Sequence, residues 1–237
     1  DLKCPTISVF AWEYSNIPTE TWDDNPRNDW RYVFSKHGRA IALSSYTANA
    51  VRDAMGSDFP VAAIPVPVWD RYFAADRVRK DSRKTYDLEV LDAIIDSRDY
   101  DLSRFRTVTD LHTSSPTSMP SHLHLDGVIF TTVFCPMDGR KNWQDIITAF
   151  CHAFHDREDV TLVFKMAHHE KWTFFGPMFG LFSELAPFKC RVVALNGLLD
   201  QAGYTNLIAA TDFYINASHC EGLCLPLMEF MSYGKPV

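Results

Sequence analysis

The sequence predicts an α/β protein with two parallel-sheet domains. Short apolar runs, typical of buried strands, alternate along the chain with stretches that have a helical apolar period. This alternation occurs once before residue 74 and again after residue 127. A segment dense in charge and then rich in Ser, Thr and Pro separates the two. We therefore expect a partial amino-terminal domain at 1–73, a linker at 74–126 and a second, incomplete domain at 127–237.

The first alternation comprises three expected strands and one helix. Apolar runs at 7–12, 40–44 and 61–66 are of strand type. The segment 44–56 begins with Ser and Thr capping candidates and ends on a glycine, so it is expected to be a helix. In the linker, a modest amphipathic stretch occupies 86–96, and alternating histidines at 122 and 124 are expected to face solvent.

The second alternation is longer and more regular. Its apolar runs predict four strands, and the intervening segments predict helices. Pro226 and Gly234 mark the start and the stop of the last helix. The chain stops where another strand should begin, which suggests truncation. The expected strands are 128–134, 160–166, 190–197 and 213–218, and the expected helices are 142–156, 174–188, 201–212 and 226–234.

Composition sets limits on function. Of the 237 residues, 46% are apolar and 22% are charged, as in a globular protein. A net charge of -7 argues against nucleic acid as a partner, because such binding needs clustered Lys and Arg. No apolar run reaches the roughly 18 residues that span a bilayer, although peripheral membrane contact stays open. The six cysteines are expected to be reduced thiols in a cytoplasmic protein.

Chemistry-bearing residues follow three of the expected strands. Arg140, Lys141 and Asn142 come just before a helix, and Lys165 ends an apolar strand. Glu221 and Gly222 follow the last strand, and Glu229 lies in the helix after it. Because carboxyl ends of parallel strands share one sheet edge, these residues predict a site there. Cations with helix-start amides suit a diphosphate, and carboxylates suit sugar hydroxyls.

Each of these residues also has a simpler interpretation. Arg140 and Lys141 could be a solvated helix start, and Lys165 could extend its ammonium into solvent. Glu221 could cap a helix against its dipole, and Glu229 could be an exposed helix position. The coincidence of all of them at one sheet edge favours a nucleotide-sugar site.

A metal site is not expected. Cys220 and Cys224, with His219 and the pair at 168–169, do not match the usual zinc-ligand spacings. No cofactor is expected either, because the nucleotide sugar would be a substrate.

The segment 218–237, SHCEGLCLPLMEFMSYGKPV, resembles the E-x7-E motif of retaining GT-B glycosyltransferases of family 4. The resemblance extends through YTNLIAATDFYINAS and DGRKNWQDIITAF, and reaches AIALSSYTANAVRDAM and VAAIPVPVWDRYF in the amino-terminal half. It covers about three quarters of the chain. It implies a GT-B type fold with two Rossmann-like domains, here lacking parts at both ends. The missing glycine-rich amino-terminal loop fits that expectation.

The resemblance also implies roles. Glu221 would hold hydroxyls of the donor sugar, and Glu229 the ribose. Lys165 and a cation of the Arg140–Lys141 pair would hold the diphosphate, and the backbone of 222–224 (Gly222, Leu223 and Cys224) would line the sugar. The implied reaction is transfer of a hexosyl-type sugar to an acceptor hydroxyl with retention and without a metal, in polysaccharide or glycoconjugate biosynthesis. This chain is expected to be inactive by itself.

Several positions depart from the family pattern. Phe134 and Cys135 stand where a Gly-Arg pair is usual, and Cys224 replaces a glycine. Trp12 and Glu13 follow the first strand where many relatives have a histidine, and VPVWD at 66–70 replaces Asn-Gly-Val-Asp. Two other functions stay open, namely a non-catalytic nucleotide-sugar binding module and a glycoside hydrolase, which also needs two carboxylates.

Overall fold

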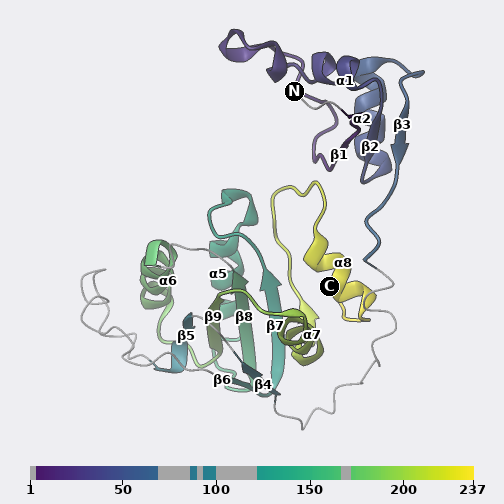
Figure 1. Ribbon diagram of the computed structural model, residues 1–237. Coiled ribbons are helices and arrows are strands. Elements are labelled where there is room, and N and C mark those ends of the chain that lie inside the picture. The colour runs from purple at the N-terminus through teal and green to yellow at the C-terminus, as the bar shows by residue number, and fades with distance from the viewer. Residues whose placement is uncertain (1–3, 69–85, 90–92, 100–121, 167–171) are drawn as a thin grey trace. The chain divides into compact units, whose positions relative to one another are not determined.

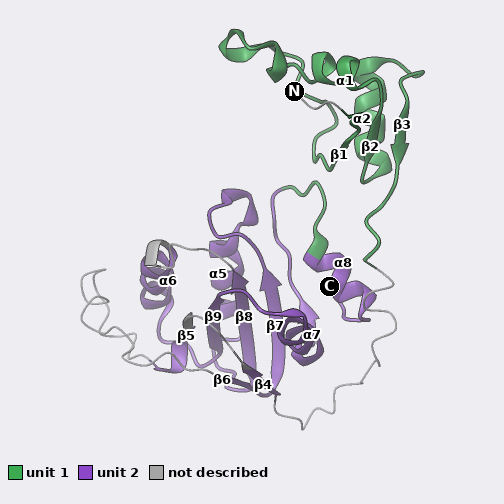
Figure 2. Cartoon of the chain, in the orientation of Figure 1, with its two compact units in different colours: residues 1–68, 220–225 green, residues 69–219, 226–237 purple. Residues whose placement is uncertain are grey.

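The computed structural model describes residues 4–68, 86–89, 93–99, 122–166 and 172–237 (Figure 1). The chain forms two compact units (Figure 2). Unit 1 contains residues 1–68 together with 220–225, and unit 2 contains 69–219 together with 226–237. The segment around Glu221 therefore belongs to unit 1, although the chain on both sides of it belongs to unit 2.

Unit 1 is built on a three-stranded parallel sheet in the order β1-β2-β3. The strands are β1 (Ser8–Phe10), β2 (Ala40–Ala42) and β3 (Val61–Ala63), each inside an expected strand. Helix α2 (Ser45–Met55) also matches its prediction, because the Ser44 hydroxyl accepts a hydrogen bond from the Thr47 amide at 3.0 Å and Gly56 ends the helix. Helix α1 (Trp30–His37) was not predicted, although Asp29 and Gly38 cap it.

Unit 2 contains a five-stranded sheet in the order β10-β7-β8-β9-β5. The four strands β7 to β10 are parallel, and each lies within the apolar run that predicted it. The sheet and its helices confirm the α/β class. Their bounds are β7 (Val128–Val133), α5 (Trp143–Ala153), β8 (Val160–Met166), α6 (Trp172–Leu185), β9 (Arg191–Asn196), α7 (Gln201–Ala210), β10 (Phe213–Tyr214) and α8 (Leu225–Ser232).

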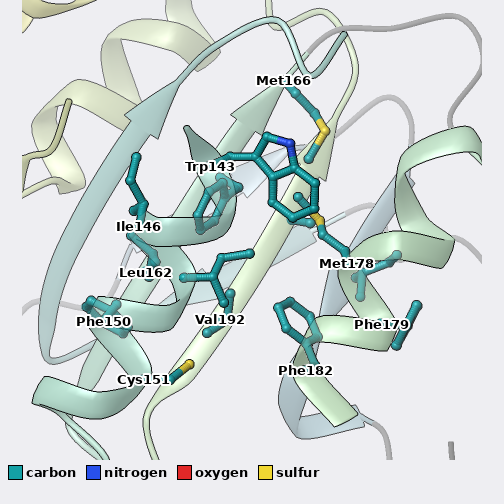
Figure 3. Close-up of a cluster of buried hydrophobic side chains, with 14 of the residues drawn as sticks. Trp143, Ile146, Phe150, Cys151, Leu162, Met166, Met178, Phe179, Phe182 and Val192 are labelled. Carbon is teal, nitrogen blue, oxygen red and sulfur yellow. The ribbon is translucent and has the colours of Figure 1, made fainter. Parts of the chain in front are cut away.

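The strand order creates a switch point. After β7 the chain adds β8 and β9 on one side, and it then returns to place β10 on the other side of β7. The first two crossover helices, α5 and α6, pack on one face of the sheet (Figure 3), whereas α7 contacts the opposite face. In doubly wound sheets, ligands bind outside the carboxyl ends of the strands where the order reverses. That point lies between β7 and β10.

The central strands of the sheet are buried on both faces, as is usual for parallel strands. Every residue of β8 and β9 is buried. On the face drawn in Figure 3, aromatic and aliphatic side chains of α5 and α6 fill the space over Leu162 and Val192. Large side chains there, such as Trp143 and Phe182, bury much apolar surface each and fix the helices against the strands.

The expected linker at 74–126 is partly wrong. It contains β4 (Tyr86–Glu89), β5 (Ala93–Asp96) and β6 (His122–Leu125), which belong to unit 2. Strand β5 pairs antiparallel with β9 and closes one edge of the sheet, and β4 pairs with β6. Leu123 and Leu125 are buried while the histidines of β6 are exposed, as the alternation predicted. Residues 74–85, 90–92 and 100–121 of this range lie outside the described residues, as does the predicted domain boundary at 73.

Gly127 joins β6 to β7 in a conformation that other residues avoid. Its φ is +73°, and a Cβ built there would lie 2.2 Å from the carbonyl oxygen of Asp159. We expect Gly127→Ala to lower the free energy of unfolding by about 2–4 kcal/mol, from left-handed backbone strain and the clash with backbone. Chemical denaturation followed by circular dichroism measures the change.

Gly180→Ala is the matched control for this substitution. Gly180 lies in α6 with nothing within 4 Å of an added Cβ. The control should stabilise the protein by about 0.5–1 kcal/mol, because alanine is the better helix former. Equal effects of the two substitutions would contradict the role given to Gly127.

Candidate functional site

Two loops meet at the switch point. The loop after β7 runs from 134 to 142, and the loop after β10 begins at 215. The backbone amide of His219 donates to the carbonyl oxygen of Arg140 at 2.8 Å. This bond joins the loops directly, so the Arg140 loop lies at the edge of the sheet where its order reverses.

Arg140 is held by a carboxylate in its own loop. Its Nε and a terminal guanidinium nitrogen donate to the two Asp138 oxygens at 3.0 and 2.8 Å. Asp138 also accepts from the Arg140 amide, and the guanidinium beside it holds the pKa of that carboxyl below its usual range. The sequence predicted two cations here, and the structure adds an anionic partner for Arg140. A bound phosphate would have to share Arg140 with Asp138.

Lys141 and Asn142 complete the approach to α5. Lys141 is half-buried, and its amide donates to the Asp138 carbonyl oxygen at 3.0 Å. Asn142 adopts a left-handed conformation, with φ of 51°, and its side chain makes no capping hydrogen bond. At the start of α7, by contrast, Asp200 accepts from the Gly203 amide at 2.7 Å. The first amides of α5 are thus not capped by their N-cap side chain, and uncapped helix-start amides suit an anion.

Lys165 lies at the carboxyl end of β8, beside β7. It pairs in register with Val133, and only 6% of it is exposed, so it does not extend into solvent. Its ammonium donates to the carbonyl oxygens of Met166, at 2.9 Å, and of Gly197. Burial lowers the pKa of Lys165 to about 8. Two carbonyl oxygens accept from this ammonium, and a bound anion would stabilise its charge further.

Glu229 projects from α8 toward α7. The hydroxyl of Tyr204 donates to Glu229 Oε2 at 2.7 Å, and the Tyr204 ring packs edge-on against Phe230. Glu229 is half-buried and positioned by this bond, so it is not an ordinary exposed helix position. Sequence reasoning missed Tyr204, because nothing in the spacing of the two residues indicates that their helices meet.

The residues of 221–224 belong to unit 1, together with the segment after β1. A Cβ added to Gly222 would lie 3.0 Å from Glu13 Oε2 and 3.3 Å from the Trp12 amide nitrogen. Close by, Tyr14 Oη and Cys220 Sγ lie 3.8 Å apart. The sequence predicted that Gly222 admits a ligand to the backbone. In the structure the close approach is made by Trp12 and Glu13, and Leu223 and Cys224 follow half-buried.

The predicted site residues are therefore divided between the units. Arg140, Lys141 and Asn142 share one loop of unit 2, and Lys165 ends the neighbouring strand. Glu229 follows β10 in the same unit, whereas Glu221 to Cys224 are part of unit 1. Asp138 was missed as a partner of Arg140. The Asp-x-Arg spacing could have indicated it, since Asp29 and Arg31 form the same pair.

The described residues give two further findings. No helix among them is long and apolar enough to cross a membrane. Within that same part of the chain, no three His, Cys, Asp or Glu side chains gather where they could hold a metal ion.

Comparison with known proteins adds no relative. No protein-family model matches the chain, and a search of curated proteins finds no match either.

Proposed function

We propose that this chain belongs to a glycosyltransferase of the GT-B type that moves a sugar from a nucleoside diphosphate to an acceptor hydroxyl with retention. The observation that supports it most is the set of groups at the switch point of unit 2. The start of α5, whose N-cap side chain makes no capping hydrogen bond, follows Arg140 and Lys141 at the same sheet edge as the end of β8. Helix amides and cations together suit the two phosphates of a nucleotide.

In this proposal the cations of unit 2 stabilise the leaving group. The bond between the anomeric carbon and the phosphate oxygen breaks, and the nucleoside diphosphate leaves with the electron pair. The acceptor oxygen bonds to the same face of that carbon, and its proton passes to the departing phosphate oxygen. Lys165 and Lys141 would offset the negative charge that develops on the diphosphate, without a metal or cofactor. Arg140 would contribute less than a free guanidinium, because Asp138 already holds it.

The two glutamates have separate roles. Glu221 would accept hydrogen bonds from hydroxyls of the transferred sugar, as the E-x7-E resemblance implies. Glu229 would accept from the ribose, and the Tyr204 hydroxyl fixes the orientation of its carboxylate. Carboxylates accept such bonds well because each of their oxygens carries negative charge.

Lys165→Ala should weaken binding of a nucleoside diphosphate by about 1.5–3 kcal/mol, the range for a charge-assisted hydrogen bond. In the unsubstituted protein, affinity should fall as the pH rises above about 8, because the pKa of the buried Lys165 is lowered to about 8 and only the ammonium attracts the anion. Isothermal titration with UDP, GDP and dTDP between pH 6.5 and 9.5 measures both effects.

Lys189→Ala, which removes an exposed lysine of the same unit, should leave affinity unchanged. Unaltered nucleotide binding by folded Lys165→Ala would remove Lys165 from the site. Thermal shifts with UDP-, GDP- and dTDP-sugars test the function as a whole. If none of them binds, and a nitrophenyl glycoside is hydrolysed instead, the protein is a glycoside hydrolase. Donor binding without transfer would favour a binding module.

A further inference from the structure

Unit 1 contains a pocket that the proposed transfer site does not use. It is lined by one continuous segment after β1, residues 12–22, and has a volume of about 280 Å³. This is slightly below the roughly 300 Å³ at which pockets for drug-sized molecules begin, so the pocket suits one small ring. Three of the lining side chains are large aromatics, namely Trp12, Tyr14 and Trp22.

The aromatic wall is fixed before any ligand arrives. Trp12 packs on Trp30 with ring centroids 4.6 Å apart, and on Tyr14 at 5.2 Å. The Trp12 indole nitrogen donates to the Asn16 carbonyl oxygen at 2.7 Å, which closes the loop on itself. Trp30 in turn packs edge-on against the buried ring of Phe34. These contacts anchor the wall to the core of unit 1, so binding would order few side chains.

Trp22 forms the exposed side of the pocket. Half of its surface is exposed, as is 46% of Tyr14. The Trp22 carbonyl oxygen accepts a hydrogen bond from the Asn28 side-chain amide at 2.5 Å. The next two residues, Asp23 and Asp24, have φ of 59° and 51°, a left-handed backbone that aspartate rarely adopts. Strained backbone of this kind is found at ligand-binding loops, where the surrounding structure holds it in place.

The polar groups around these rings identify the ligand class. Asn16, Thr19 and Glu20 also line the pocket, and the described lining residues include no Lys or Arg. The nearby Arg31 donates to the Thr19 carbonyl oxygen at 2.9 Å, but it is paired with Asp29. The Glu20 carboxylate in the lining therefore disfavours phosphates and other anions. Aromatic faces carry negative charge density that attracts the C–H groups of a sugar ring, while the carboxylate and amide can take its hydroxyls. We propose that this aromatic pocket binds one uncharged pyranose ring.

Residues of the pocket contact the segment 220–222, which contains Glu221. Trp12 and Glu13 make the close approach to Gly222, and Tyr14 contacts Cys220. All of these residues belong to unit 1. The pocket is therefore beside the segment that carries Glu221. If the proposed function holds, the bound ring belongs to the acceptor, so the acceptor is a glycoconjugate or a growing saccharide.

Titration of the 237-residue chain with methyl α-D-pyranosides of glucose, mannose and galactose tests the pocket. Tryptophan fluorescence and isothermal titration report binding, and cyclohexanol and uridine serve as comparison ligands. We expect at least one pyranoside to bind. Trp22→Ala and Tyr14→Ala should each raise its Kd at least tenfold, and Glu20→Gln should raise it less. Tyr46→Ala, which removes an exposed tyrosine of unit 1 outside the pocket, should change the Kd less than twofold.

Several outcomes would overturn the inference. These are no binding of any pyranoside, equal binding of cyclohexanol, binding of uridine alone, or an unchanged Kd in folded Trp22→Ala. The experiment also separates this proposal from the proposed function. Pyranoside binding with no nucleotide binding would keep the pocket and remove its acceptor role. Nucleotide binding that Lys165→Ala weakens, with no pyranoside binding, would keep the function and remove the pocket.

Discussion

Glu221→Gln should lower kcat for sugar transfer about 10- to 100-fold while changing the donor KM little. In the proposed function, Glu221 accepts hydrogen bonds from hydroxyls of the sugar that is being transferred. Hydrogen bonds from those hydroxyls to a carboxylate are worth about 1.5–3 kcal/mol, and they strengthen as charge develops on the ring in the transition state. Glutamine keeps the shape but not the charge. An interaction that counts mainly in the transition state reduces kcat when it is removed.

The measurement uses steady-state kinetics of sugar transfer with the best nucleotide sugar. Glu229→Gln is the matched control, because it makes the same chemical change eight positions later in the motif. It should mainly raise the donor KM, since the ribose is remote from the reacting carbon. Equal effects of both substitutions on kcat alone would contradict the separate roles. Full activity in both would leave the motif with a structural role only.

Arg191→Met should lower the free energy of unfolding by about 3–5 kcal/mol, the range for breaking a buried ion pair by removing one partner. The Arg191 guanidinium donates to Asp96 Oδ2 from Nε at 2.8 Å and from a terminal nitrogen at 2.5 Å, and to the His124 carbonyl oxygen at 2.7 Å. Both side chains are about nine-tenths buried. Methionine fills a similar volume but leaves the Asp96 carboxylate buried without its cation.

Urea denaturation followed by circular dichroism measures this loss. Arg157→Met is the control, because Arg157 and Asp159 form an ion pair with side chains 56% and 57% exposed. Water screens that pair, so its loss should change stability far less. Asp96→Leu combined with Arg191→Met should recover part of the loss, because the Asp96 carboxylate is then no longer left buried without its cation. If Arg191→Met lowers the free energy of unfolding no more than Arg157→Met does, the Arg191–Asp96 pair does not stabilise the packing of β5 against β9.

The regular elements could be predicted from the sequence because their signals are local. A strand buried on both faces is apolar along most of its length, so runs such as VTLVFKM predict β8 directly. Helices with local caps were also predictable. Helix α2 begins after the Ser44 cap and ends at Gly56, as predicted. Gly234, predicted to stop the last helix, follows α8 with φ of +85°. The sheet edge at which Arg140 and Lys165 lie followed from the same alternation, since parallel strands end together.

Only the tertiary structure decided the states of the site residues. The pairing of Arg140 with Asp138 and the burial of Lys165 against two carbonyl oxygens depend on loop conformation, which the apolar pattern does not encode. Strand β5 was hidden in an apparent linker, because an edge strand of four residues has too short an apolar run to stand out. The approach of Gly222 to Glu13 joins segments that are about 200 residues apart in the sequence. Contacts of that kind are fixed by packing among distant segments, and no local signal in either segment specifies the partner.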